Sequence, residues 1–397
     1  MTMLFSGVSQ GFGRFSYALV IPSLIHTTLH SVALAGTLGS ANVGAYLVGS
    51  ITVTLISKYF RATTLIRLGL LLATSGIFTF ALSDSFGVFF IAMALAGFGG
   101  ALIWLPSPGI AAAAVETNKK AWAMGMTGAG IGVAITFAGQ LSRYLTGLPG
   151  LWSWKALWLV EAGVAMIAVA AAFGPLQRIN RLPSTPGPRP SATTPPLADG
   201  EPSGPSRHKV PGRTLLTAIY MVYGLVQGVF LTFVVTALEH DHHFSSGSAS
   251  FVFATVGFFS IFGGILSGRI SDRVRNRASV MGVAFLAMAL ACYAISDGAL
   301  VMVIPGAIFY GLGVSGIPNL VGAHLGDHLP THAFAGAFAL VTLFFGIAQA
   351  VGPQLGGMLE VASGSFRLEY LLLAGVATIG AALSFALNFV GRGGTLP

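Results

Sequence analysis

The chain has 397 residues, of which 54% are hydrophobic and only 8% are charged. Soluble domains carry about 25% charged residues, so this chain cannot cover its apolar surface against water and is predicted to be a polytopic membrane protein. The formal net charge of +8 requires no nucleic-acid partner, because the basic residues concentrate in particular loops. The single cysteine, Cys292, lies in an apolar run and excludes an intrachain disulfide.

The apolar runs predict membrane-spanning helices, each of which needs about 20 residues. The first run carries Arg14 in its middle, which a cleavable signal peptide would not, and the missing basic leader suggests a start further upstream. The runs are too long for barrel strands and lack their alternation. The fold is therefore predicted to be an all-α membrane protein with twelve spans, at 3–25, 34–56, 63–82, 86–112, 120–141, 156–174, 213–238, 248–270, 278–296, 299–323, 332–358 and 366–390.

The basic residues predict the orientation of these spans. Of the 20 lysines and arginines, 16 fall on the side that holds both termini, 3 fall on the other side, and Arg14 lies within a span. Basic loops favour the cytoplasm, so both termini are expected to be cytoplasmic, in the inner membrane of a bacterium. Trp152, Trp154 and Trp158 are then expected at the outer interface, where indole rings prefer to lie.

A proline-rich segment at 175–212 separates two apolar blocks, which we predict to be domains at 1–174 and 213–397. The segment holds ten of the nineteen prolines. Proline-rich polar sequence cannot bury enough surface to fold, so an extended cytoplasmic tether is expected. A proline-motif partner site is the alternative.

The two blocks repeat each other at an offset of about 213 residues. A parallel repeat of two six-helix bundles implies a pseudo-twofold axis along the membrane normal, with the substrate site between the halves. The pairs in register are Gly11 with Gly224, Gly44 with Gly257, Gly49 with Gly263, Gly99 with Gly311, Pro106 with Pro318, and Gly139 with Gly352.

The segment GRISDRVRNR resembles the loop signature of the major facilitator superfamily, and the matching residues are Gly268, Asp272, Arg273 and Arg277. The resemblance implies that this loop helps to lock the inward-closed state, whereas a basic loop without a gating role is the alternative. The N-terminal counterpart has Lys58 where Asp272 stands, which questions a symmetric gate. The run from Gly352 to Gly357 resembles the superfamily's glycine-proline motif, and GFGRFSYALVIP is similar to the first helix of the YbfB/YjiJ-like branch.

Arg14 is the foremost candidate for substrate binding. It lies 11 residues after Met3, about 16 Å along a helix, near the bilayer centre, where a charge is usually functional. Gln10, Arg14 and Tyr17 would share one helix face, and the seventh span offers a matching face with Tyr220, Tyr223 and Gln227. We expect Arg14 to bind an anionic group, foremost a carboxylate, through paired hydrogen bonds. A buried ion pair or a helix-end carbonyl contact is the alternative.

Two acidic positions are candidates for proton coupling. The predicted spans place Glu161 as the only acidic residue well inside the membrane, and a buried carboxyl group could carry a proton. An interfacial or arginine-paired structural role is the alternative. Asp327 lies with His324, His328 and His332 at the inner end of the tenth span, where a proton relay competes with plain solvated loop residues.

Other polar or kinked positions carry weaker expectations. Freed carbonyl groups near Pro106 and Pro318 can line a cavity, so Trp104 and Asn319 are candidate cavity walls, with a purely structural kink as the alternative. Gln140 and Gln349 are further candidates. The run Glu239 to His243 has adjacent side chains rather than a metal-site spacing, so we expect no metal and no cofactor.

The motifs that are missing narrow the function. The chain has no GxxxxGK[ST] phosphate loop and no HExxH or GxSxG motif, which disfavours ATP-driven transport and an enzyme. The leading prediction is a secondary transporter, working as a monomer, that moves a small organic solute, foremost an anion, by alternating access with proton coupling. Efflux of amphipathic compounds, which 29 phenylalanines and 11 methionines would suit, and a membrane sensor that binds without transport are the alternatives.

Overall fold

The computed structural model describes residues 1–57, 59–116, 120–145, 153–174, 212–329 and 331–390, of which 120–122, 153 and 331–336 are described by their backbone alone. Lys58, Trp152 and nearly all of the predicted tether lie outside the described residues. Every element in the described part is helical.

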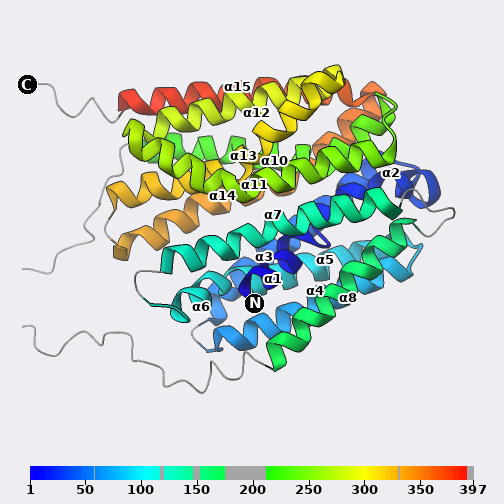
Figure 1. Cartoon of the computed structure of the whole chain (residues 1–397), viewed down its shortest axis with the longest axis horizontal. Coiled ribbons are helices and arrows are strands. Elements are labelled where there is room, and N and C mark those ends of the chain that lie inside the picture. The colour runs from blue at the N-terminus through cyan, green and yellow to red at the C-terminus, as the bar shows by residue number, and fades with distance from the viewer. Residues whose placement is uncertain (58, 117–119, 146–152, 175–211, 330, 391–397) are drawn as a thin grey trace, which may run out of the picture.

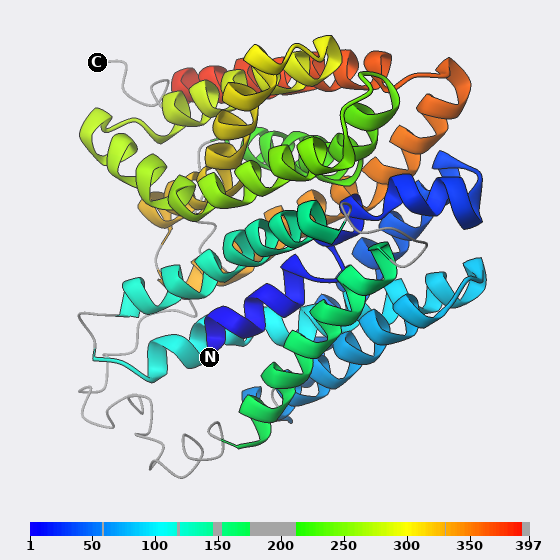
Figure 2. The same cartoon turned by 45° about the vertical axis from the view of Figure 1, so that its right-hand side comes forward.

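The helices form two groups that lie side by side, as both views show (Figures 1 and 2). The first group opens with five short pieces, α1 (Thr2–Ser6), η1 (Gly7–Gly11), η2 (Phe15–Leu19), α2 (Ile21–Leu24) and η3 (Ile25–Leu29). It continues with α3 (Val32–Ile56), α4 (Ala62–Leu82), α5 (Phe86–Trp104), α6 (Ser107–Ala113), α7 (Lys120–Leu145) and α8 (Ser153–Phe173). The second group consists of α10 (Arg213–His240), α11 (Ser246–Val274), α12 (Arg277–Asp297), α13 (Leu300–His328), α14 (Thr331–Ser363) and α15 (Phe366–Val390).

Eleven spans within the described residues are long and apolar enough to cross a membrane. They match eleven of the twelve predicted spans, and the exception is the first. A continuous helix at 3–25 is wrong, because π-helical, extended and 3-10 segments replace regular helix there. The predicted span at 86–112 is interrupted between Trp104 and Ser107, as Pro106 leads one to expect.

Glycine contacts reproduce the predicted twofold repeat. A Cβ on Gly11 would lie 2.2 Å from a side-chain atom of α7, and one on Gly224 would lie 2.3 Å from a carbonyl oxygen of α14. Similarly, Gly49 packs against α5 and Gly263 against α13. Each pair therefore occupies an equivalent interface in its own half, which agrees with two bundles related by a pseudo-twofold axis.

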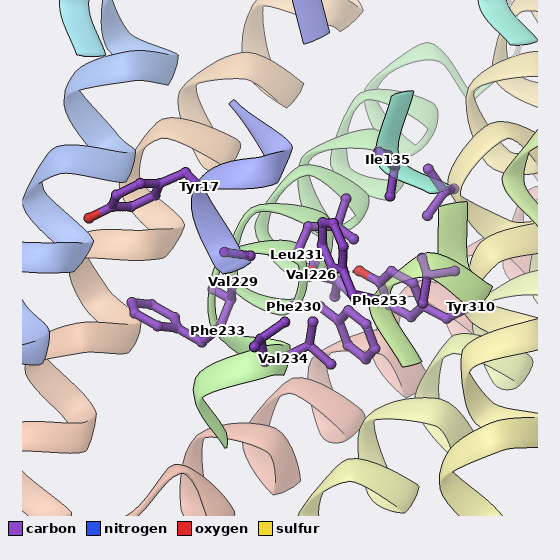
Figure 3. Packing of buried hydrophobic residues seen from close by; sticks show 14 of the residues in the cluster. Tyr17, Ile135, Val226, Val229, Phe230, Leu231, Phe233, Val234, Phe253 and Tyr310 are labelled. Carbon is purple, nitrogen blue, oxygen red and sulfur yellow. Dashed lines mark hydrogen bonds between the residues drawn. The ribbon is translucent and has the colours of Figure 1, made fainter. Parts of the chain in front are cut away.

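One buried hydrophobic cluster joins the two groups of helices. Figure 3 shows Tyr17 and Ile135, which belong to the first group, near Val229 and Phe253 of the second. The prediction that Trp154 and Trp158 face the membrane interface is wrong, because they are only 5% and 0% exposed. Trp158 stacks on Phe80 with 4.0 Å between ring centroids, so the aromatic packing of the bundle outweighs the interfacial preference of indole.

The long helices run between two ends of the molecule. We call the end at which α8 finishes and α10 begins the linker end, and the opposite end, at which α3 begins and α7 finishes, the far end. Alternate helices therefore run in opposite directions between the same two ends.

The close approach of α3 and α5 gives a stability prediction. A Cβ on Gly97 would lie 2.0 Å from the backbone oxygen of Asn42, whereas one on Gly87 of the same helix would meet nothing within 4 Å. We expect Gly97→Ala to destabilise the protein by about 1–3 kcal/mol through overpacking, and Gly87→Ala to be neutral. Thermal unfolding in detergent measures both. Equal melting temperatures for the two variants would contradict the packing described here.

Candidate functional site

The first span is broken at Gly13, and neighbouring helices hold the break. Gly13 has a φ of +64°, which favours glycine. Its backbone N–H donates to Ser16 Oγ over 3.2 Å, and its carbonyl oxygen accepts from Asn42 Nδ2 over 3.2 Å. Asn42 also donates to the backbone oxygen of Met93 on α5 over 2.9 Å. The break is therefore fixed by α3 and α5 rather than by local sequence alone.

Glu161 of α8 supports the same break. The Ser16 hydroxyl donates to Glu161 Oε2 over 2.8 Å, and Glu161 is 0% exposed. Of the ion pairs between described residues, none includes Glu161. Its carboxyl group therefore binds the first span at Ser16, two residues after Arg14.

Arg14 follows the break directly and joins the two halves of the molecule. Its Nη1 donates to Gln10 Oε1, and its Nη2 donates to Gln349 Oε1 on α14. Gln349 in turn donates through Nε2 to Gln227 Oε1 on α10 over 2.8 Å. The guanidinium group lies 4.8 Å from the centroid of the Tyr46 ring, which adds a cation–π contact. A polar chain thus crosses from the first span to the second half at Arg14.

The positive charge of Arg14 has no carboxylate partner within the described part of the chain. None of the ion pairs found there includes Arg14, and its buried Nε has no hydrogen-bond acceptor. The neighbours are neutral amides and aromatic rings. The described residues therefore do not form the buried ion pair that was the alternative. The Nε of Arg14 remains as a donor for an anionic group.

Arg14 lines a small cavity between the two groups of helices. The walls come from the first span, α3, α5, α10 and α14, and they are Arg14, Phe15, Tyr17, Gly39, Asn42, Val43, Met93, Gln227, Gly228, Leu231, Thr232, Gln349 and Pro353. Every one of the five elements contributes, so a relative movement of the two halves would change the shape of this cavity.

The sequence-predicted site residues are brought together only in part. Arg14, Tyr17 and Gln227 line the cavity, and Gln10 binds Arg14. They do not share one regular helix face as expected, because the helix is broken between Gln10 and Tyr17. Tyr17 is anchored by donating its hydroxyl group to the backbone oxygen of Ala35 over 3.0 Å.

Tyr220 and Tyr223 support the site from α10. Their rings stack with centroids 5.7 Å apart, and Tyr220 stacks on Phe345 of α14 at 4.5 Å. The Tyr223 hydroxyl donates to the backbone oxygen of Val314 over 2.6 Å, so it fixes α10 against α13. Both rings therefore pack around the site without lining the cavity itself.

Trp104 and Asn319 lie elsewhere, and Gln349 takes a larger part than its sequence signal indicates. Trp104 ends α5 and is not among the cavity walls. Asn319 donates to the backbone oxygen of Gly264 over 2.9 Å, so it links α13 to α11. The sequence gives only weak support for a site role of Gln349. Its partner Arg14 lies 335 residues away in the chain, so their hydrogen bond can be recognised only in the assembled structure.

The loop signature forms an ion-pair network at the linker end. Arg277 pairs with Asp272 at 2.5 Å and with Asp327 at 3.1 Å, and it donates to Ser271 Oγ over 2.5 Å. Asp327, a candidate proton carrier, is thus a partner of the loop that carries the family signature. Arg273 is exposed. A Cβ on Gly268 would lie 3.3 Å from Asn319 Nδ2.

Two histidines of the predicted relay lie together at the same end. The rings of His324 and His328 are 4.6 Å apart, and His328 Nδ1 lies 2.8 Å from the backbone oxygen of His324. His324 Nε2 is buried without a partner among the described residues. This group is separated from Glu161, which contacts the first span.

The glycine-proline motif closes the far end between the two halves. A Cβ on Gly36 of α3 would lie 2.3 Å from the backbone oxygen of Pro353, and one on Gly357 would lie 2.7 Å from that of Val32. The Thr37 hydroxyl donates to Gln354 Oε1 over 2.6 Å. Close backbone approach between small residues is what membrane helices use for tight association.

The contact between α7 and α11 is also tighter toward the far end than toward the linker end. Toward the far end, Cβ atoms on Gly132 and Gly139 would lie within 3 Å of α11, and Ser142 hydrogen-bonds Ser250 over 3.0 Å. Toward the linker end of α7, Gly125 and Gly128 have nothing within 4 Å of a built Cβ. The halves are therefore packed together at the far end and apart at the linker end in this conformation.

Comparison with known proteins places this architecture. Over its whole length, the chain resembles a bacterial homologue of the human lysosomal transporter Spinster in an inward-facing and occupied conformation, with a TM-score of 0.76, 16% identity, and coverage of 98% of this chain and 96% of that chain. It also resembles the D-xylose-proton symporter, with a TM-score of 0.74, 13% identity, and coverage of 96% and 95%. At these low identities, the TM-scores show a shared fold.

Two curated relatives match part of the chain. The human and mouse glucose-6-phosphate exchangers SLC37A1 are 32% and 31% identical over 179 residues, which are 42% of this chain and 33% of each relative. The match thus spans about a third of the relatives' length. The family model described as "Uncharacterised MFS-type transporter YbfB" matches residues 6–385. With nearly the whole chain matched, and with the Arg277 loop and the two-bundle fold in place, the protein belongs to this YbfB-type family of major facilitator superfamily transporters.

Proposed function

We propose that this transporter moves a small organic anion by proton-coupled alternating access and that Arg14 binds the anionic group. The observation that supports the proposal most strongly is a guanidinium group in the cavity between the two halves, with neutral hydrogen-bond partners and an unpaired Nε. A cation held near the middle of a membrane protein is costly and usually serves a ligand or a partner charge. A carboxylate or a phosphate can meet the planar guanidinium with two hydrogen bonds.

The comparisons support the chemical class without fixing the substrate. The partial relatives are named for glucose-6-phosphate, which carries an anionic group. The structural neighbours include a protein named as a D-xylose-proton symporter, which bears on proton coupling and not on an anionic substrate. On the basis of Arg14 and the partial relatives, we place small carboxylates and organic phosphates first among the candidate substrates of this chain.

The proposed cycle follows from the asymmetry between the ends. In the present conformation the glycine contacts of α3 with α14 and of α7 with α11 close the far end. Rocking of the halves would separate these contacts and bring together the linker ends, at which Arg277 pairs with Asp272 and Asp327 within the second half. In alternating access, one end of the central site opens as the other end closes.

The orientation and the coupling ion complete the proposal. The basic residues favour a cytoplasmic linker end, in the inner membrane of a bacterium, so the present conformation would face the cytoplasm. Glu161 is our foremost candidate for a coupling carboxyl group, because it is buried and reaches Arg14 through Ser16 and the break at Gly13. Asp327 and His324 lie at the linker end, where Asp327 pairs with Arg277.

The binding role of Arg14 predicts a specific loss of transport. In proteoliposomes that contain a pH-sensitive dye, a panel of small carboxylates and organic phosphates is expected to include a substrate that drives proton flux. Arg14→Lys should weaken the apparent affinity about 10- to 100-fold, because charge-assisted hydrogen bonds contribute about 1.5–3 kcal/mol and lysine lacks the planar fork. Arg14→Ala should abolish substrate-dependent flux.

The matched control for this experiment is Arg213→Gln, which removes an exposed arginine at the start of α10. It should transport like the parent. Normal affinity in Arg14→Lys would overturn the binding role, and saturable binding without flux under any gradient would favour a sensor over a transporter.

If Glu161 couples transport to protons, its substitution should abolish substrate accumulation driven by a pH gradient but preserve substrate exchange. Glu161→Gln cannot carry a proton but can still accept from Ser16, so substrate exchange across the membrane at equal pH should continue. Accumulation driven by a pH gradient should be lost. Asp84→Asn, which removes an exposed acid that pairs with Lys155 at 2.8 Å, serves as the control and should accumulate substrate normally. Gradient-driven accumulation in Glu161→Gln at the parent's level would rule out this role.

A further inference from the structure

The far end contains a second buried acid that the sequence does not single out. Glu369 on α15 is 3% exposed and Glu360 on α14 is 7% exposed, although both lie near helix ends rather than well inside a predicted span. Glu369 is the fourth residue of its helix. Its position near a helix end makes it resemble an interfacial residue, although the assembled bundle encloses it.

Glu369 lacks every partner that a buried carboxylate needs. Both of its oxygens are buried without a hydrogen-bond donor among the described residues, and none of the ion pairs in that part of the chain includes it. A buried charge without donors or a counter-ion is strongly unfavourable. In this packing the group is therefore compatible with a neutral, protonated acid.

The charged groups that act on Glu369 are acidic, whereas the basic side chains of His240 and Arg367 lie on the side of Asp241. From α14 it faces Glu360, and from the turn after α10 it faces Asp241. Asp241 is already bound by the hydroxyl of Ser365 and the backbone N–H of Arg367, over 2.8 and 3.0 Å, and by His240, whose Nδ1 lies 2.7 Å from its Oδ1. The aromatic neighbour Tyr370 donates its hydroxyl to the backbone oxygen of Phe230.

The carboxyl group touches the helix that closes the far end. A Cβ on Gly356 of α14 would lie 2.9 Å from Glu369 Oε1 and 3.0 Å from a ring carbon of Phe233. The next residue, Gly357, packs on the backbone of Val32 in the other half. At this level α14 is held between Glu369 on one side and α3 on the other.

A polar hollow connects this region with the solvent at the far end. It is lined by Asp241, His242, Ser296, Asp297, Ser365 and Arg367. Asp241, which lines the hollow, is also one of the two acids that face Glu369. The hollow therefore brings solvent to Asp241, an acid that interacts electrostatically with Glu369.

We propose that Glu369 is a proton-binding site that permits closure of the far end: the protonated acid lets α14 pack on α3, and loss of the proton favours their separation. The physical reason is that an ionised Glu369 needs water or a donor. Displacement of α14 from Glu369, which would also carry Gly357 away from Val32 of α3, would admit that water. The proposal rests on alternating access, and it adds a proton site that is distinct from Glu161.

The test measures far-end separation directly and uses no substrate. Spin labels are placed at Thr27 of η3 and Ala362 of α14, both exposed at the far end of opposite halves, while the buried Cys292 is left in place. Distances in the reconstituted full chain are measured from about pH 5 to about pH 9, where buried carboxyl groups titrate. The parent should shift from a short to a longer distance as the pH rises.

The variants identify the responsible group. Glu369→Gln, which resembles the protonated acid, should keep the short distance at every pH. Glu369→Asp should retain the pH-dependent shift, and Glu360→Gln should retain it with a changed midpoint. Size-exclusion profiles establish that each variant is folded.

Three results would overturn the proposal: no pH-dependent shift in the parent, an unchanged shift in Glu369→Gln, or a shift that follows Na⁺ at constant pH. Because no substrate is present, these outcomes are independent of whether Arg14 binds an anion. Failure of the Arg14 experiment with a positive result here would leave the proton site in place.

Discussion

The hydrogen-bonded chain from Gln10 through Arg14 and Gln349 to Gln227 is the interaction on which the rest of this structure depends. It brings a permanent positive charge to the boundary between the two halves and surrounds it with neutral amides. Such an arrangement is stable only while Arg14 is held in place. The break at Gly13 does this, since Asn42 and Ser16 bind its two backbone groups. A regular helix would have satisfied those groups internally and would have left Arg14 on a different face.

A single helix connects this site with the far-end closure. Along α14, Gln349 binds Arg14, Pro353 both lines the cavity and packs on Gly36, and Gly356 contacts Glu369. Movement of α14 away from α3 would therefore alter the cavity wall and the closure together, and movement of α14 relative to α15 would also alter the burial of Glu369. A substrate that competes with Gln349 for the guanidinium would weaken a bond between the halves at the same time. Because packed cores switch between discrete arrangements rather than deforming continuously, local exchange at Arg14 can bias the position of the whole half.

The sequence predicts the twelve-span layout, the repeat and a position for Arg14 between the halves, because hydrophobic length and a charge in an apolar run are local signals. It fails where tertiary contacts decide. The conformation at Gly13 depends on Asn42 of α3, which binds its carbonyl oxygen, and on Ser16, which binds its N–H. The hydrophobic pattern of the first span contains neither contact and therefore predicts a continuous helix. The pattern places Trp158 at the membrane interface because its stacking partner Phe80 is distant in sequence. Glu369 escapes sequence reasoning because its burial comes from α14, whose glycine allows the close approach.

In the proposed role, Arg14 recognises the negative charge of the substrate rather than merely bracing the two halves. The binding affinities of a transported acid and of its neutral amide, measured for the parent and for Arg14→Gln, distinguish these two roles. Recognition of charge predicts that the substitution weakens binding of the acid by about tenfold or more, as the loss of a charged hydrogen bond requires, and leaves binding of the amide nearly unchanged. Equal losses for both compounds would contradict this claim and would assign Arg14 to the architecture of the cavity alone.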